Sequence, residues 1–535
     1  MSTLPAGSDA ATAGFSLASL TPVLLLGSLI LIVCVLAIRL SNRTGLPSLL
    51  IYLGVGLVIG ESSVPVDVTS AQLTQALGYC ALIVILAEGG LTDQWRSMRP
   101  SIVPATLLAT VGVAVSIAVV AVMTRLLLNW SWTTALLVGA ILSSTDAAAV
   151  FSVLRNVPLP RRLVGMLEAE SGFNDAPVVI IVVALAEQAA HPGTGHHPLV
   201  LLALAAIELV GGAAIGLAVG WVGSSALRHS ASGSSGLFSL GILAVTVLAY
   251  AVATTAHTSG FIATYLSALV IGSRRLPHRQ AVHAFAQAAG WLAQIGLFVL
   301  LGLLAKADRL VEHLVPAVIV GLVLLLLARP LSVAASVAWF GLSLREQAFL
   351  SWAGLRGAVP VVLATVPATA GAPGLDWIFD LVFLLVVIFT LLQAPTLPWV
   401  AKRLGVVESH RSRELSVEST PIEELDAQLL QVDVGEGSML HGVAIFELRL
   451  PVGANVTLVV RDGQGLVPSG RTILRHGDQL LVVTTDAVRD RAETLIRRVS
   501  EHGRLAGWSR PRALQKRPGR AGFGTIGGTP GFDDD

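Results

Sequence analysis

A chain of 535 residues in which 54% are hydrophobic and only 13% are charged has more apolar surface than one water-soluble core can bury. Its 35 Lys and Arg residues nearly balance 34 Asp and Glu residues, so the formal net charge is +1. This balance argues against a nucleic-acid partner, which requires a basic surface. The composition therefore excludes an ordinary soluble protein and indicates a multi-pass membrane protein surrounded by lipid.

A helix needs about 20 apolar residues to cross a bilayer, and shorter apolar runs are typical of broken or internal helices. On that basis we predict an all-α membrane part with about 13 transmembrane helices. The runs are centred on residues 20–38, 46–60, 75–91, 102–124, 133–154, 163–186, 199–224, 236–255, 259–272, 287–305, 314–340, 347–368 and 378–399. No charged n-region or cleavage site precedes the first run, so we expect it to be a retained span rather than a signal peptide.

The basic residues alternate between successive loops, as the positive-inside rule requires of a correctly counted set of spans. Even-numbered loops hold Arg125, Lys306 and Arg309. Odd-numbered loops and the segment after the last span carry Arg39, Arg43, Arg96, Arg99, Arg155, Arg161, Arg162, Arg228, Arg274, Arg275, Arg279, Arg345, Lys402 and Arg403. We therefore expect the N-terminus to be outside the cell and the C-terminus in the cytoplasm, in an inner (plasma) membrane protein.

After Arg403 the sequence becomes polar and then takes on the pattern of a soluble domain. Short alternating runs, LLQVDV, AIFELRL, VTLVVRD and QLLVVTT, are separated by turn signals such as GEGS and RDGQG. They predict a small β-rich cytoplasmic domain closed by the helical segment AVRDRAETLIRRVS. The Gly, Pro and charge content of the last residues is typical of disorder. We divide the chain into a transmembrane domain (1–404), a linker (405–421), a β-rich domain (422–500) and a tail (501–535).

Acidic and polar side chains interrupt the apolar run at residues 163–186, where a charge in lipid costs at least about 2.5–3.5 kcal/mol. In a helix, Glu170 and Asn174 share one face because they are four residues apart, and Ser171 and Asp175 share the adjacent face. These four side chains point into one sector. A functional site is therefore the first hypothesis for them.

Two other apolar runs contain polar or helix-breaking residues. VGAILSSTDAAAV holds Thr145 and Asp146, which offer the hard oxygen ligands that small cations prefer. SWAGLRGAVPVVLA holds Arg356 between glycines and before a proline, a composition that breaks a helix and frees backbone carbonyls. Two interrupted segments far apart in sequence predict the crossed broken helices of a secondary transporter with inverted repeats.

With these motifs the chain resembles the NhaP-type bacterial cation/proton antiporters of the sodium/proton exchanger superfamily. The resemblance rests on SSTDAAAV at 143–150, EAESGFNDAPV at 168–178, SGFIATYLSALVIGSRR at 259–275 and GLRGAVPVV at 354–362. Residues 437–483 are similar to the C-terminal ligand-binding half (TrkA-C) of potassium-transport regulatory subunits. The combination resembles the potassium/proton branch once called cell volume regulation protein A, with roles in pH and volume homeostasis.

The resemblance implies a role for each residue of the motifs. The transported K⁺ or Na⁺ would be held by Asp175, Asp146, Ser171 and the backbone carbonyl of Thr145. It also implies a homodimer.

Supporting residues follow from the same resemblance. Glu170 would pair with Arg356, since a lone arginine in a span needs a buried partner and breaking such a pair costs about 3–5 kcal/mol. Asn174 before Asp175 resembles the electroneutral branch, which implies one proton exchanged per cation.

One carboxylate that binds either a proton or a cation, but not both, is sufficient for antiport. Burial of Asp175 favours its protonated form, whereas a bound cation favours its ionised form, so proton and cation exclude each other. Such exchange requires no covalent chemistry. We therefore expect a transporter rather than an enzyme, without a cofactor, although a nucleotide could regulate the C-terminal domain.

Two other function classes remain as alternatives. A cation channel gated by the cytoplasmic domain would present a filter of backbone carbonyls, but the sequence contains no TVGYG-like stretch. An intramembrane aspartyl protease would need a Gly-x-Gly-Asp context, whereas Asp146 and Asp175 stand in TDAA and NDAP. K⁺ and Na⁺ use the same ligands, and only the appended domain favours K⁺.

Overall fold

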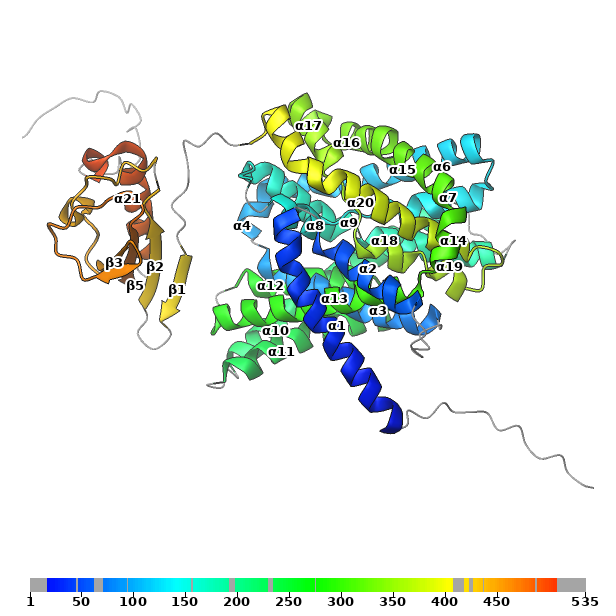
Figure 1. Ribbon diagram of the computed structural model, residues 1–535, viewed down its shortest axis with the longest axis horizontal. Helices are drawn as coiled ribbons and strands as arrows, with labels where there is room; N and C mark the ends of the chain where they lie inside the picture. The colour runs from blue at the N-terminus through cyan, green and yellow to red at the C-terminus, as the bar shows by residue number, and fades with distance from the viewer. Residues whose placement is uncertain are drawn as a thin grey trace, which may run out of the picture. The chain divides into compact units, whose positions relative to one another are not determined.

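The computed structural model divides into two compact units, Met1–Glu408 and Ser409–Asp535, which are described separately here (Figure 1). It describes residues 17–44, 47–61, 71–93, 95–154, 157–191, 198–229, 234–274, 276–407, 418–422, 427–435, 437–485 and 488–507. Most of the predicted linker and all of the predicted tail from residue 508 lie outside this set, as do Arg155 and Arg275.

The first unit is built from helices, as predicted. They are α1 (Leu17–Thr44), α2 (Ser48–Glu61), α3 (Ala71–Thr92), α4 (Trp95–Met98), η1 (Arg99–Ser101), α5 (Ile102–Leu107), η2 (Leu108–Gly112), α6 (Val113–Leu128), α7 (Trp132–Ile141), α8 (Ala147–Leu154), α9 (Arg161–Ala190), α10 (Pro198–His229), α11 (Ser235–Thr255), α12 (Gly260–Gly272), α13 (Arg279–Leu304), α14 (Ala307–Glu312), α15 (Leu314–Val323), η3 (Leu324–Ala328), α16 (Arg329–Val337), η4 (Ala338–Phe340), α17 (Leu344–Trp352), α18 (Ala358–Leu363), α19 (Val366–Thr369) and α20 (Trp377–Leu404).

Among the described residues, 8 helices are long and apolar enough to cross a membrane. Shorter apolar helices accompany them at Leu24–Ala37, Ser48–Gly60, Trp132–Ile141, Gly260–Gly272 and Ala358–Thr369. Together they fall in the predicted apolar runs, which confirms the polytopic helical fold. The runs at 133–154 and 347–368 each contain helices separated by a non-helical stretch, as their breaking residues predicted.

Local sequence signals explain where the helices near the site begin and end. Asn129 adopts the left-handed conformation that ends α6, with φ of 55°. Ser131 then caps α7, because its side chain accepts the Thr134 N–H at 3.1 Å. Pro177 inside α9 has no N–H to donate, so the helix loses one backbone hydrogen bond within two residues of Asp175.

The second unit is a small β-domain with the strand order β1-β2-β5-β3-β4, all neighbours antiparallel. The strands are β1 (Glu418–Ile422), β2 (Ala427–Asp433), β3 (Ala454–Arg461), β4 (Gln464–Leu466) and β5 (Gln479–Thr485). Helix α21 (Arg489–His502) contributes Ala492, Ile496 and Val499 to the apolar core, which confirms the helix that closes the domain. A short turn, η7 (Arg504–Gly507), follows it.

One of the runs taken as strand-like folds differently. AIFELRL forms the 3₁₀ turn η6 (Ile445–Leu448), which ends where Arg449 takes a positive φ of 46°. The carboxylate of Glu447 accepts the Ala444 N–H at 2.9 Å and stabilises the turn. The hydrogen bond from the Ala444 N–H to a side chain three residues later favours a turn, although the alternation of apolar and polar residues predicted a strand. The runs in β2, β3 and β5 form strands as predicted.

Candidate polar site where two interrupted helices cross

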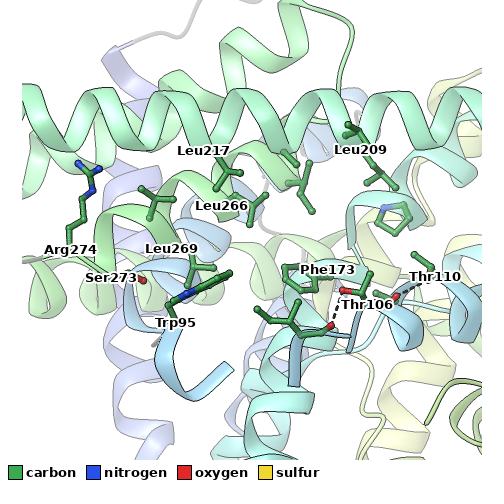
Figure 2. Close-up of a pocket in the computed structure, with 17 residues that line it drawn as sticks. Trp95, Thr106, Thr110, Phe173, Leu209, Leu217, Leu266, Leu269, Ser273 and Arg274 are labelled. Carbon is green, nitrogen blue, oxygen red and sulfur yellow. Dashed lines mark hydrogen bonds between the residues drawn. The ribbon is translucent and has the colours of Figure 1, made fainter. Parts of the chain in front are cut away.

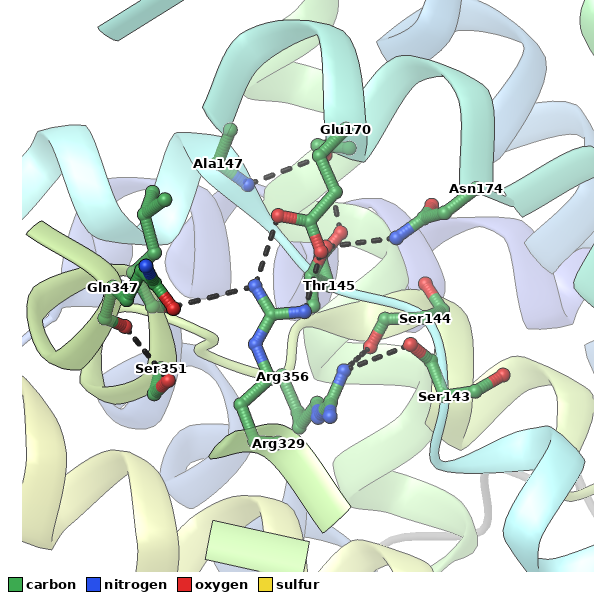
Figure 3. A network of polar contacts seen from close by, with 12 residues as sticks. Ser143, Ser144, Thr145, Ala147, Glu170, Asn174, Arg329, Gln347, Ser351 and Arg356 are labelled. Carbon is green, nitrogen blue, oxygen red and sulfur yellow. Dashed lines mark hydrogen bonds and ion pairs between the residues drawn. The ribbon is translucent and has the colours of Figure 1, made fainter. Parts of the chain in front are cut away.

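The breaks between α7 and α8 and between α17 and α18 meet inside the helical unit (Figure 3). The backbone N–H of Asp146, in the first break, donates to the carbonyl of Leu355 in the second at 2.9 Å. Each interruption leaves backbone N–H and C=O groups without helical hydrogen-bond partners. The hydrogen bond from Asp146 to Leu355 gives one such group in each break a partner in the other break. The crossed broken helices predicted from the sequence are confirmed.

Arg356 reaches from the second break to the first. Its Nη1 donates to the carbonyl of Ser143 at 2.9 Å and also to the carbonyl of Ser144. The guanidinium is 4% exposed, so these carbonyls replace water as its hydrogen-bond partners. The positive charge therefore holds the first break open and fixes the crossing point.

Asp175 lies beside the first break and is 8% exposed. The hydroxyl of Ser144, in the first break and 31 residues earlier in the chain, donates to its Oδ1 at 2.6 Å. One turn before it on α9, the hydroxyl of Ser171 donates to the Thr145 carbonyl at 3.1 Å and accepts the Ala147 N–H at 3.2 Å. The carboxylate is thus tied to the interrupted segment by neighbouring hydroxyls.

Asn174 completes the contacts between α9 and the break. Its Nδ2 donates to the Thr145 hydroxyl at 2.8 Å, and its Oδ1 is buried without a hydrogen-bond partner among the described residues (Figure 3). A buried carbonyl oxygen without a donor retains its full capacity to accept a ligand.

Asp146 begins α8, and its Oδ1 accepts the Ala149 N–H at 3.1 Å. Gly357 lies against it, and a Cβ at position 357 would overlap the Asp146 carboxylate. The glycine in the second break is therefore required by the acid in the first. The structure brings Thr145, Asp146, Ser171, Asn174 and Asp175 together, as the sequence predicted.

The predicted ion pair between Glu170 and Arg356 is wrong. Glu170 instead pairs with Arg329 through both oxygens, with distances of 2.5 Å to Nη1 and 2.9 Å to Nη2. Both side chains are buried, at 3% exposed for Glu170 and 6% for Arg329. The partner differs because Arg356 already has the backbone carbonyls of the break, whereas Arg329, at the start of α16, reaches Glu170 directly.

Two contributors to the site were missed or underrated in the sequence. Arg329 in LLLLARPLS is one, and a lone arginine in an apolar run is itself a signal for a buried acid partner. Ser144 is the other, in the SSTDAAAV motif. Its position directly before the Thr–Asp pair was the available signal.

Gly354 has a similar spatial role to Gly357. A Cβ there would lie 2.5 Å from Nε of Arg329. The two glycines of GLRG therefore make room for the two charged groups, Arg329 and Asp146, on either side of the crossing. Among the described residues, no group of three or more His, Cys, Asp and Glu side chains is placed to hold a metal ion.

Comparison with known proteins identifies both units. Residues 29–403 match the family described as sodium/hydrogen exchanger, transmembrane, and residues 429–497 match the TrkA-C domain. The chain is 35% identical over 474 residues to the K(+)/H(+) antiporter NhaP2 of Shewanella oneidensis, covering 87% of this chain and 81% of that protein. It is 33% identical to the K(+)/H(+) antiporter NhaP of Alkalimonas amylolytica, covering 86% and 80% respectively.

More distant similarities agree with these. The Na(+)/H(+) antiporter NhaS2 of Synechocystis is 27% identical, over 65% of this chain and 66% of that one. Among solved structures, the sodium proton antiporter MjNhaP1 from Methanocaldococcus jannaschii has the same fold, with a TM-score of 0.61 at 21% identity, covering 70% of this chain and 97% of that chain.

Proposed function

The chain belongs to the sodium/hydrogen exchanger family, and from that premise we propose that it exchanges a monovalent cation for protons across the membrane at one site centred on Asp175. The cation is the transported substrate. Its ligands are the carboxylates of Asp175 and Asp146, the Ser171 hydroxyl and the Thr145 carbonyl. The observation that carries the proposal is the burial of Asp175 against the crossing of two interrupted helices.

The proposed mechanism uses one carboxylate for both substrates. Ionised Asp175 binds the cation with the oxygens around it, and protonated Asp175 cannot, so each side of the membrane exchanges one for the other. The Ser144 hydroxyl binds the Asp175 carboxylate directly, while Ser171 and Asn174 hold α9 against the break through the carbonyl and hydroxyl of Thr145. Arg356 and the Glu170–Arg329 pair keep the break rigid. Movement of either arginine toward the site would break its buried hydrogen bonds, to the Ser143 carbonyl for Arg356 and to Glu170 for Arg329.

K⁺ is the substrate we propose ahead of Na⁺. Two of the relatives above carry K(+)/H(+) in their names, and the TrkA-C domain accompanies this transport unit in one chain. The 27% identical relative is named for Na(+), which makes the choice of ion the first quantity to measure. Hard oxygen ligands serve both ions, so cavity size and flexibility decide between them.

We propose electroneutral exchange because Asn174, which bears no charge, precedes the single acid Asp175. One cation then replaces one proton. A membrane potential imposed with a thiocyanate gradient, which leaves the K⁺ gradient in place, should leave the exchange rate unchanged, and a clear dependence on that potential would contradict this stoichiometry.

The proposed orientation places the N-terminus outside and the C-terminal domain in the cytoplasm of a plasma-membrane protein. It rests on the basic residues of the odd-numbered loops, such as Arg161, Arg162 and Arg274, with Lys402 and Arg403 after α20. A homodimer is proposed from the family expectation. We further propose that the C-terminal domain, predicted at 422–500 between a linker (405–421) and a tail (501–535), regulates transport. Its ordered part is slightly longer than predicted, because β1 begins at Glu418 and α21 and η7 extend to Gly507.

The test is cation-dependent dequenching of a pH-sensitive dye in everted vesicles, with K⁺, Na⁺, Rb⁺ and Li⁺ compared. Asp175→Asn should abolish exchange while the protein remains inserted, because it removes the proposed proton carrier. Asp146→Asn should weaken cation binding and retain some exchange. Asp308→Asn, in the exposed part of α14, is the matched control and should behave as wild type.

Normal exchange by the Asp175→Asn protein would overturn the mechanism. Cation uptake that continues after the pH gradient is collapsed would favour the alternative, a gated cation channel. Uptake of radioactive Rb⁺ into the same vesicles measures the second result, so the antiporter and channel hypotheses are separated in one preparation.

A further inference from the structure

An apolar cavity of about 580 Å³ is lined by α9, α10 and α12, with further residues from α4, α5 and η2 (Figure 2). Phe173 and Pro177 of α9 line it, as do Leu217 of α10 and Leu266 of α12. Nearly all of its surface is carbon. A volume of several hundred Å³ is that of a small-molecule or lipid site rather than of a packing defect.

One end of this cavity is different from the rest. Trp95 of α4, Ser273 and Arg274 lie there, whereas the side chains further along are apolar or threonine (Figure 2). All three hydrogen bonds of Arg274 to described residues come from one nitrogen, Nη1, to the Ser224 and Ser225 hydroxyls at 2.9 Å and the Trp221 carbonyl at 3.3 Å. Its partners in the described part of the chain include no carboxylate.

The Trp221 ring lies over one flat face of this guanidinium, 5.5 Å from Cζ to the ring centroid, so an anion would bind at the edge of the group rather than on that face. Arg binds phosphate through two parallel N–H donors, and the uncompensated charge at the cavity end favours such a ligand. Trp95 is 45% exposed, and tryptophan is enriched where hydrocarbon meets the headgroup region. The two residues mark this end as the membrane–water interface.

The length of the cavity matches one leaflet. Ile262 lines the cavity on α12, and Gly272, where α12 ends two residues before Arg274, is 10 positions further on, which corresponds to roughly 15 Å along a helix rising ~1.5 Å per residue. The hydrocarbon core of a bilayer is about 30 Å thick, so one leaflet occupies about half of that. An acyl chain that enters at Arg274 would end near Ile262.

We propose that this cavity binds an anionic glycerophospholipid, with one acyl chain between α9 and α12 and the phosphate on Arg274. Anionic headgroups are bound by basic residues between transmembrane helices at the cytoplasmic side, which is where the orientation proposed above places Arg274. The lipid chain contacts α9 at Phe173 and Pro177, on both sides of Asp175 in sequence. It therefore fills the space between the helix that carries the ion site and the helices α10 and α12.

The probe is phosphatidylglycerol with a photoactivatable diazirine in one chain, added to full-length protein in phosphatidylcholine vesicles. Phosphatidylcholine with the same diazirine chain is the comparison, because it has the same apolar part and no net charge. After illumination, peptide mass spectrometry maps the labelled residues. We expect phosphatidylglycerol to label the residues around Leu217 and Leu266 roughly tenfold more than phosphatidylcholine, the ratio expected for a hydrogen-bonded charged group.

Arg274→Gln should reduce phosphatidylglycerol labelling to the phosphatidylcholine level. Arg279→Gln is the matched control, since it removes the same charge from the next helix start without lining the cavity, and it should retain the preference. Ala213→Phe, which fills the cavity from α10, should reduce labelling by both lipids. If that variant does not insert, Leu217→Trp fills the same space from the same helix.

Equal labelling by the two lipids would overturn the proposal, because it would mean ordinary contact with surrounding lipid. Loss of the preference in Arg279→Gln as large as in Arg274→Gln would also overturn it, since surface charge would then be the cause. Binding is read here without transport, so failure of the proposed antiport would not affect the result.

Discussion

Glu170 binds Arg329 through both carboxylate oxygens, at 2.5 and 2.9 Å, across 159 positions of the chain and entirely inside the protein. Gly354 leaves the space for this arginine, and the Leu350 carbonyl accepts from its Nη2 at 3.4 Å. The pair therefore joins α9, which carries Asp175, to α16 and to the approach to the second break.

Glu170→Gln should destabilise the protein strongly, because Arg329 would be left buried and unpaired, a loss of about 3–5 kcal/mol. Glu170→Gln combined with Arg329→Met should recover part of that loss. Thermal unfolding followed by intrinsic fluorescence in detergent measures the recovery as a double-mutant cycle. The control cycle uses Arg356→Gln with Glu170→Gln, and a larger coupling there would show that Arg356 is the true partner.

Gly357→Ala should weaken cation binding, because the new methyl group overlaps the Asp146 carboxylate. Overpacking of about 1–3 kcal/mol, if it falls on the cation-bound state, corresponds to a rise of roughly 5- to 150-fold in the cation concentration that gives half-maximal exchange. Gly296→Ala in α13 is the matched control, since a methyl there meets nothing within 4 Å. Equal effects of the two substitutions would mean that the crossing point tolerates a side chain at position 357.

A protein that stops after Glu408 should still exchange cations for protons, because every residue assigned to ion binding lies before it. The dependence of rate on cytoplasmic pH or on a regulatory ligand should change, since a regulatory domain acts only by binding two states of the transporter unequally. Exchange in proteoliposomes at several internal pH values measures both.

The position of the stop matters. Val406 is 6% exposed and belongs to the apolar core of the first unit, so a stop after Leu404 removes a packed side chain and should give a less stable protein. A correctly inserted protein ending at Glu408 that shows no exchange at any pH would make the C-terminal unit part of the transport machinery.

The C-terminal unit should lose stability in acid through Asp478. Burial alone would raise the pKa of this carboxyl, but hydrogen bonds from Arg461, at 2.7 and 2.8 Å, and from the Arg475 N–H, at 2.7 Å, lower the pKa below its ordinary value. A lowered pKa in the folded state adds stability above the unfolded-state value of about 3.9, and that stability is lost as the pH falls below it.

Urea unfolding of the fragment 409–535 at pH 7 and at successively lower pH measures this effect. Asp478→Asn should flatten the dependence of the free energy of unfolding on pH between about 5 and 3. Asp462→Asn, in the exposed turn after β3, should leave the dependence as in wild type. An unchanged slope in Asp478→Asn would show that another carboxyl is responsible.

The sequence alone determined the membrane part of the fold, because lipid restricts the options. A chain this apolar must satisfy its backbone hydrogen bonds inside each span, so apolar length predicts helices and breaking residues predict interruptions. The same reasoning pointed to the proposed polar site, since acidic and amide side chains in apolar runs, such as Asp175, Asn174 and Asp146, are costly in lipid. In the soluble unit, where side chains such as Glu447 compete with backbone pairing, the alternating pattern was a weaker guide.

Only the tertiary structure decided which buried charges pair. Arg329 and Arg356 are both lone arginines in apolar segments. From the sequence, either could be the buried cation that pairs with Glu170. The choice depends on which helix packs against α9 and on where the broken helices leave free carbonyls. Arg356 lies beside the carbonyls of Ser143 and Ser144, whereas Arg329 faces Glu170. Sequence spacing carries no information on such contacts, because they are set by the packing of helices far apart along the chain.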